Sequence, residues 1–261
     1  MHNFEFVKPS TVAEAVKALG REDAQALAGG HTLLPTMKQR LAAPAVLVSL
    51  TGIADLRGIR REGDALVIGA ATTHAEVAKA AAKDYPALAK LACGIGDPAV
   101  RNRGTIGGSL ANNDPAADYP AAALASGATI ATDRRQIAAD DFFQGLFTTA
   151  LEPGEIITAI RLPIPERAAY AKFEQPASRF ALTGAFVAKY PSGARVAITG
   201  AGENGVFRWA EAERALSANY APSALSGLAV PSDGLIGDLH GTPAYRANLV
   251  RVMTGRAVAA S

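Results

Sequence analysis

The sequence predicts an α+β fold, and three observations lead to that prediction. Threonine is followed three residues later by glutamate at 11–14 and 73–76, which is the capping-box pattern of a helix start. Residues 155–162 alternate in polarity like a half-buried strand, and three further strand-like runs follow between 170 and 199. With 261 residues and 49% hydrophobic content, the chain can bury a substantial core.

The first stretch, residues 1–55, reads as a βαβ-like unit. An extended segment at 4–8 precedes a helix whose apolar positions Val12, Ala15, Val16 and Leu19 recur at helical spacing and which ends near Gly20. We then expect a small-residue strand at 24–28, a short helix at 36–40 and a second strand at 46–50.

Residues 56–165 form the second stretch. A hairpin is expected from LRGIR and ALVIGA, followed by a helix capped by Thr73 and another from Pro86 to about Cys93. Further predicted elements are a helix from Tyr119 through Leu124, strands at 129–131 and 136–138, and the alternating strand that two prolines stop.

Residues 166–261 form the third stretch. Strands are expected at 170–174, 181–190 and 194–199, which together favour an antiparallel sheet. A helix over 211–216 and a final helix follow, the last one capped by Thr242 with Pro243 at its first position.

Two glycine segments stand out from this framework. The central one, residues 101–119, reads RNRGTIGGSLANNDPAADY, and the earlier one, residues 28–32, reads AGGHT. Successive N–H groups in such turns form concave nests for phosphate oxygens, so two of them suit one pyrophosphate. Each segment alone is equally typical of a tight turn. Neither matches GxGxxG or GxxxxGK[ST], so a Rossmann domain or P-loop is not supported.

Composition excludes several classes of function. The 26 basic and 24 acidic residues leave a net charge of +2, which favours neither nucleic acid nor a membrane surface as partner. A single cysteine, Cys93, excludes a cysteine-ligated iron–sulfur cluster within the chain, and four widely spaced histidines argue against a metal site. No apolar run approaches the length of a membrane span, and we expect a cytoplasmic protein.

Four motifs, in this order and spacing, resemble one known family over essentially the whole chain. They are AGGHTLLPTMKQRLAAPAVLVSL, IGAATTHAEV, GDPAVRNRGTIGGSLANNDPAADYP and GEIITAIRLP. The chain is similar to the FAD-binding medium subunits of molybdenum hydroxylases, which include carbon monoxide dehydrogenases, aldehyde oxidoreductases and xanthine dehydrogenases. The resemblance implies a two-subdomain FAD-binding fold of the PCMH type, with subdomains at 1–55 and 56–165, followed by a small C-terminal α+β flavoprotein domain at 166–261.

The resemblance also implies positions for the FAD contacts. The first pyrophosphate loop would be Leu27, Ala28, Gly29, Gly30, His31, Thr32 and Leu33, and the second Thr105, Gly107, Gly108 and Ser109. Asn112 would add a polar contact, Asp118 would bind ribityl or ribose hydroxyls, and Ile95 and Ile157 would lie beside the flavin. Lys172 resembles a flavin-contacting lysine, with Glu174 as a competing candidate. No residue is nominated as general acid, base, nucleophile or metal ligand.

The resemblance further implies partners. A large subunit with a molybdenum–pterin cofactor would oxidise the substrate, and a small iron–sulfur subunit would carry two 2Fe-2S clusters. This chain would pass their electrons to an external acceptor, within a heterotrimer or a dimer of heterotrimers. Two alternatives stay open: a stand-alone FAD-dependent oxidase, in which His31 is covalently attached to the flavin, and a non-catalytic assembly subunit that has lost the cofactor. Intact glycines in both segments argue against the second, on the premise that packing alone does not require them.

Overall fold

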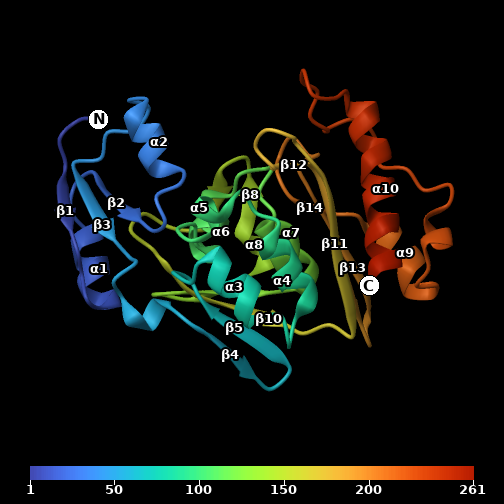
Figure 1. Cartoon of the computed structure of the whole chain (residues 1–261), viewed down its shortest axis with the longest axis horizontal. Coiled ribbons are helices and arrows are strands. Elements are labelled where there is room, and N and C mark those ends of the chain that lie inside the picture. The colour runs from blue at the N-terminus through green and yellow to red at the C-terminus, as the bar shows by residue number, and fades with distance from the viewer.

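The computed structural model describes residues 1–261, and it confirms the α+β prediction. The N-terminal unit, residues 1–55, holds a three-stranded parallel sheet in the order β1-β3-β2 (Figure 1). Its elements are β1 (Glu5–Val7), α1 (Val12–Leu19), β2 (Ala24–Leu27), α2 (Leu33–Lys38) and β3 (Val46–Ser49), and the 3₁₀ turn η1 (Ala54–Leu56) leads into the middle unit.

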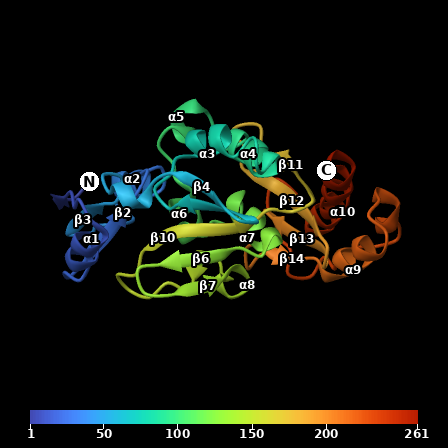
Figure 2. The ribbon, with the colours of Figure 1, turned by 90° about the horizontal axis from the view of Figure 1, so that it is seen from below.

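The middle unit, residues 56–165, is built on a five-stranded antiparallel sheet in the order β4-β5-β10-β6-β7. Figure 2 shows β10 in the centre of this sheet, between β4 and β6, and helices α6 and α7 pack against β10. The strands are β4 (Ile59–Glu62), β5 (Ala65–Gly69), β6 (Thr129–Thr132), β7 (Gln136–Ala138) and β10 (Ile157–Pro163), beside a small hairpin of β8 (Phe143–Gly145) and β9 (Thr148–Thr149). The helices are α3 (His74–Ala80), α4 (Pro86–Cys93), α5 (Pro98–Arg101), α6 (Ile106–Asn112), α7 (Tyr119–Ser126) and α8 (Ala139–Phe142).

The C-terminal unit, residues 166–261, is a four-stranded antiparallel sheet between two layers of helices (Figure 1). One face packs on α4 and α7 of the middle unit, and the other on α9 and α10. Its elements are β11 (Arg167–Glu174), β12 (Ala181–Tyr190), β13 (Gly193–Thr199), β14 (Phe207–Arg208), α9 (Ala210–Ala218), the 3₁₀ turn η2 (Pro222–Leu225) and α10 (Pro243–Ala260).

The hydrophobic cores cross the limits between these units. The largest core combines the middle unit with Tyr170 and Phe186 from the C-terminal sheet. The core of the N-terminal unit takes in Leu56, Ala71 and Ile156 of the middle unit. We propose residues 55 and 165 as domain limits because each lies between two sheets, but the shared cores make the three units one packed body.

Several local predictions need correction. Thr11 caps α1 by accepting the Glu14 N–H, but the Glu14 carboxylate accepts from Ser10 and not from Thr11, so the reciprocal half of the capping box is wrong. The second capping box, Thr73 with Glu76, is complete. The helix expected at 36–40 begins three residues earlier, at Leu33. Helix α6 was not predicted. It contains Gly107, Gly108 and Ser109, which were expected to lie in the second pyrophosphate loop.

No helix of the structure combines the length and the apolar character that crossing a bilayer requires.

Candidate functional site

The first glycine segment presents a row of free backbone donors. The N–H groups of Gly29, Gly30, His31 and Thr32 make no hydrogen bond within the protein. Gly30 has φ +77°, a left-handed conformation that lets the chain turn sharply between β2 and α2. Unpaired successive N–H groups form a concave site for anionic oxygens. The geometry of this segment suits a phosphate group.

The second glycine segment differs from the expected loop. Thr105 N-caps helix α6 by accepting the Gly108 N–H at 3.1 Å, and Gly107 donates to the Ala70 carbonyl at 2.9 Å. The Ser109 N–H also bonds, to the Thr105 carbonyl at 3.0 Å. The N–H groups of Gly107, Gly108 and Ser109 are therefore not the free backbone donors expected of a second nest, whereas the Thr105 N–H makes no hydrogen bond within the protein.

The glycines themselves are required by packing within the protein. A Cβ on Gly29 would lie 2.1 Å from the Arg103 carbonyl oxygen, and one on Gly107 would lie 2.5 Å from the Ala70 Cβ. A Cβ on Gly104 would lie 2.5 Å from His74 Nε2. The premise that packing does not demand these glycines is wrong, because the two segments and the β5–α3 connection approach each other at backbone distance. Their presence consequently does not exclude an assembly subunit without cofactor.

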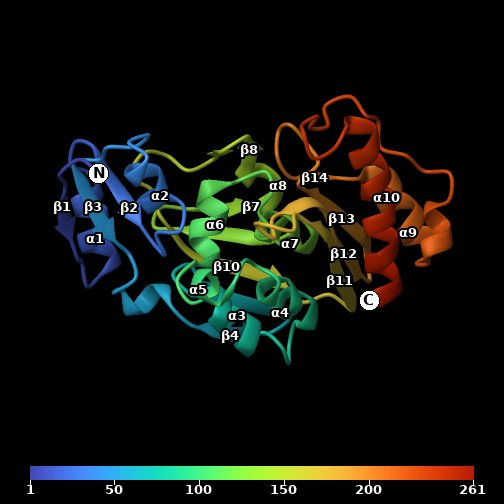
Figure 3. The same ribbon diagram turned by 45° about the horizontal axis from the view of Figure 1, so that its top comes forward.

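A cavity of about 600 Å³ lies where the two segments meet. Figure 3 shows α6 on the side of the middle unit that faces β2 and α2 of the N-terminal unit. The volume falls in the range of cofactor and ligand sites. Fifteen of the sixteen predicted site residues line it: Leu27, Ala28, Gly29, Gly30, His31, Thr32, Leu33, Ile95, Thr105, Gly107, Gly108, Ser109, Asn112, Asp118 and Ile157.

Lys172 is the predicted residue that does not line the cavity. Its buried ammonium donates to the Gly94 carbonyl at 2.9 Å and to the Arg179 carbonyl at 2.8 Å, and it lies 3.2 Å from Asp118 Oδ1. The competing candidate, Glu174, is half-exposed and lies 3.9 Å from the Lys172 ammonium. Neither side chain reaches the cavity surface.

Asp118 lies on the cavity wall at the start of α7 with its carboxylate paired to the protein. Tyr170 donates to Asp118 Oδ1 at 2.5 Å, and the Lys172 ammonium is within 3.4 Å of Oδ2. Burial raises the pKa of Asp118, and the Lys172 charge and the Tyr170 hydroxyl oppose that rise. A carboxylate held in this way is an oriented acceptor for a hydroxyl of a ligand.

His74 lines the cavity but is not among the residues expected to contact FAD. It is the first residue of α3 and is 5% exposed, it lines the cavity, and its Nδ1 has no hydrogen-bond partner. Burial, with help from the charges of His31 and Arg101, lowers the pKa of His74 to about 4. The Tyr119 ring lies 5.3 Å away between centroids, and its buried hydroxyl is unpartnered too. The imidazole is neutral at pH 7, so it presents a polar but uncharged surface.

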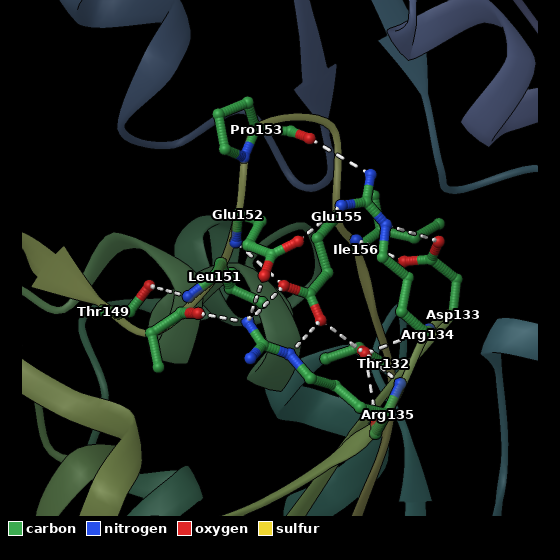
Figure 4. A network of polar contacts seen from close by, with 11 residues as sticks. Thr132, Asp133, Arg134, Arg135, Thr149, Leu151, Glu152, Pro153, Glu155 and Ile156 are labelled. Carbon is green, nitrogen blue, oxygen red and sulfur yellow. Dashed lines mark hydrogen bonds and ion pairs between the residues drawn. The ribbon is translucent and has the colours of Figure 1, made fainter.

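Glu155 anchors the far wall of the cavity in a network of polar contacts (Figure 4). Its carboxylate accepts from Arg135 at 2.9 and 3.0 Å, from Thr132 at 2.7 Å and from the Glu152 N–H at 2.8 Å. The Arg135 hydrogen bonds chiefly lower the pKa of Glu155 to about 2. With both carboxylate oxygens occupied, Glu155 holds the β6–β7 turn to the chain entering β10, which places Ile157 on the wall.

Apolar side chains make up much of the remaining lining. Leu50, Leu56, Ile95, Leu151 and Ile157 come from separate elements of the first two units. Phe180 is the one lining residue from the C-terminal unit, and it is 46% exposed in the structure. Sequence reasoning missed Phe180 because a lone aromatic residue before a strand carries no motif. The cavity thus combines free N–H donors at one place with apolar walls elsewhere, which suits a ligand with both phosphate and planar aromatic parts.

Comparison with known proteins gives a consistent result. Residues 2–165 match the family described as the FAD binding domain in molybdopterin dehydrogenase. The carbon monoxide dehydrogenase medium chain of Afipia carboxidovorans is 39% identical, with 98% of this chain and 96% of the relative covered. The nicotine 6-hydroxylase medium subunit of Paenarthrobacter nicotinovorans is 32% identical, with 97% and 95% covered.

Solved structures agree. A structure of the Cu,Mo-CO dehydrogenase in its cyanide-inactivated form contains a chain with a TM-score of 0.88 and 36% identity, covering 98% of this chain and 96% of that one. A chain of quinoline 2-oxidoreductase from Pseudomonas putida 86 gives a TM-score of 0.89 at 29% identity, covering 99% and 96%. The chain therefore belongs to the family of FAD-binding subunits of molybdenum-dependent dehydrogenases and hydroxylases, as an oxidoreductase component.

Proposed function

We propose that this chain is the electron-transfer subunit of a multisubunit molybdenum hydroxylase. In this proposal a small partner subunit carries 2Fe-2S clusters and a large partner subunit carries the molybdenum–pterin cofactor, at which the substrate is oxidised. This chain binds FAD and passes the electrons from the clusters to an external acceptor. The assembly is a heterotrimer, or a dimer of heterotrimers, in the cytoplasm.

The observation that carries the proposal is the row of free N–H groups from Gly29 to Thr32 on the wall of the cavity. Pyrophosphate is the part of FAD with charged oxygens, and backbone donors can solvate it without a metal ion. The second segment contributes differently, through the side chain of Ser109 and the close approach of Gly108, which lines the cavity without a side chain.

Bound FAD supplies the redox chemistry, because it accepts electrons singly and stores two of them. The residues of this chain bind and orient. Asp118 presents a fixed acceptor for hydroxyl groups, while Ile95, Ile157 and Phe180 supply apolar contact and exclude water. His74 is neutral and cannot deliver a full charge to the site at pH 7. None of these roles requires a general base or a nucleophile.

The substrate of the whole enzyme is oxidised on the large subunit, so its identity is not written in this cavity. Relatives with high coverage are named for carbon monoxide, nicotine and glyceraldehyde. We propose that the complex oxidises carbon monoxide, an aldehyde or an N-heterocycle, and that the electron acceptor is a quinone, oxygen, NAD or another carrier.

The alternative of a stand-alone oxidase requires a substrate pocket over the flavin. Phe180 is the one cavity residue contributed by the C-terminal unit, whose second sheet face is filled by α9 and α10. That arrangement supports the subunit proposal over the oxidase. An assembly subunit without cofactor is distinguished by FAD uptake and not by the glycines, since those are needed for packing.

The test is an absorption spectrum and metal analysis of the protein purified from its native source with its subunits together. Flavin, iron and molybdenum with two further chains would support the proposal, and substrate-driven bleaching of the flavin only in the intact complex would establish the route of the electrons. Flavin on a lone chain that is reduced by a simple alcohol would refute it in favour of an oxidase. A colourless chain that still assembles its partners would refute it in favour of an assembly subunit.

A further inference from the structure

The Lys172 ammonium joins three separate segments beside the cavity. It donates to the Gly94 carbonyl at the end of α4 and to the Arg179 carbonyl in the β11–β12 turn, and it pairs with Asp118 at the start of α7. An ammonium has three donors, and each of these finds a protein acceptor. No donor of Lys172 is left for a ligand.

The turn that Lys172 holds carries Phe180 to the cavity. The turn is closed by Gln175 N–H to the Phe180 carbonyl at 2.9 Å and by Arg179 N–H to the Gln175 carbonyl at 2.8 Å. Arg179 has φ +60°, which is unfavourable for a residue with a side chain, so the turn needs external contacts to keep this shape. Arg179 supplies one by donating to the Gly96 carbonyl at 3.1 Å, and Lys172 supplies the other.

The same ammonium is the counter-ion of a buried acid. Lys172 and Asp118 have side chains only 6% and 5% exposed, and the remaining groups that face Asp118 are the hydroxyl of Tyr170, the Tyr119 side chain and the more distant Glu174. None of these is a second cation. Without Lys172 the carboxylate would be left buried and unpaired, which is the costly half of a broken ion pair.

We propose that Lys172 is a positioning residue that pins the Phe180 turn over the cavity and keeps Asp118 as an ionised acceptor, and that it does not itself contact the bound cofactor. The expected effect on binding rests on the proposed FAD site. The hydrogen bonds by which Lys172 joins the turn to the end of α4 do not depend on any ligand. One side chain thereby couples the C-terminal unit to the cavity wall formed by the middle unit.

The experiment compares Lys172→Met with Lys90→Met, a matched control on the exposed face of α4. Hydrogen exchange of residues 175–181 is measured in the protein without FAD, and the FAD dissociation constant is measured between pH 6 and pH 8. We expect at least tenfold faster exchange of this turn in Lys172→Met and a dissociation constant raised at least tenfold. The raised constant should increase further as the pH falls, because the unpaired Asp118 takes up a proton. Wild type and Lys90→Met should show neither effect.

A second variant, Lys172→Met with Asp118→Asn, guards against a simple failure to fold. It removes both charges together, so it should recover stability and lose the pH dependence of FAD binding while the turn still exchanges fast. Unchanged hydrogen exchange of residues 175–181 in Lys172→Met would contradict the proposal that Lys172 holds this turn in place. A dissociation constant that rises equally at every pH would overturn the role toward Asp118 and indicate direct contact. Failure of the wild type to bind FAD would refute the proposed function instead. The hydrogen-exchange result would still decide whether Lys172 holds the turn.

Discussion

Replacing His74 should make the stability of this chain less dependent on pH between pH 7 and pH 4. His74 is 5% exposed and its Nδ1 has no partner, so the folded protein resists its protonation. The unfolded chain takes up this proton near pH 6.5, whereas the folded chain does so only at about 4. Between these values the unfolded state binds more protons, and the free energy of unfolding therefore falls as the pH falls.

The expected size follows from the two pKa values. A gap between 6.5 and about 4 corresponds to about 3 kcal/mol, at about 1.4 kcal/mol for each pH unit. The contribution of His74 to the free energy of unfolding is fully present above pH 6.5, and it is lost progressively as the pH falls toward 4. A loss of this size is a large fraction of the typical stability of a domain.

The assay is urea unfolding of the FAD-free protein at steps from pH 7.5 to pH 4. Trp209 is the single tryptophan and is 2% exposed, so its fluorescence reports unfolding of the C-terminal core. His74→Phe keeps a ring beside Tyr119, and His74→Leu serves as a smaller alternative in case the larger ring overpacks the site. The exposed His240→Asn is the control.

Both His74 variants should show a pH dependence that is flatter than wild type by about 3 kcal/mol between pH 6.5 and pH 4. The control should follow wild type. The difference between variant and wild type is the relevant quantity, since contributions of other groups such as Asp118 cancel in it. Identical pH dependence in wild type and both variants would refute the argument that burial holds His74 neutral.

Three further predictions concern packing and acid stability. Gly29→Ala would place a Cβ 2.1 Å from the Arg103 carbonyl oxygen, so it should lower the unfolding midpoint and abolish FAD uptake, whereas Gly20→Ala, with its nearest atom at 3.5 Å, should do neither. Glu155→Gln should flatten the loss of stability between pH 4.5 and about 2, where protonation of the wild-type carboxylate breaks its hydrogen bonds; an unchanged acid limb in denaturation curves would count against the network. Phe142→Ala empties a fully buried site and should cost about 3–5 kcal/mol in urea unfolding, and a cost under about 1 kcal/mol would contradict its place in the core.

Local signals predicted much of the fold. The helix Pro86–Cys93 has the bounds that its proline start and apolar run indicated, and the hairpin of β4 and β5 turns at Gly63, which has φ +62°. The residues that specify these two segments lie within them, so local sequence is enough to predict their structure. Strand order across the three sheets is not local, and no spacing in the sequence predicts that β10 pairs with both β5 and β6.

Helix α6 shows where local reasoning fails. Its sequence begins Ile-Gly-Gly-Ser, and glycine is a poor helix former, so the segment reads as a loop. Contacts from distant residues stabilise the helix, because Gly107 and Ile106 donate to carbonyls of Ala70 and Thr72 in the preceding connection. Tertiary packing therefore overrides propensity at this segment.

The candidate site was predicted better than its detailed chemistry. The positions of the two glycine segments and Asp118 followed from motifs, and the structure brings all of them to one cavity. Two of the three contacts of Lys172 could not be predicted, since Asp118 and Gly94 lie 54 and 78 residues away in the chain. His74 and Phe180 were missed for the same reason, because each becomes a cavity residue only through packing of distant segments.

The measurement that tests the central claim most directly is a titration of the purified, FAD-free chain with FAD, followed by the quenching of flavin fluorescence. The account predicts saturation at one FAD per chain, release of the flavin by acid, and no uptake by Gly108→Asp, whose carboxylate would enter the site of the pyrophosphate. Normal FAD uptake by Gly108→Asp, or no uptake by the wild-type chain, would contradict the assignment of this cavity as the FAD site.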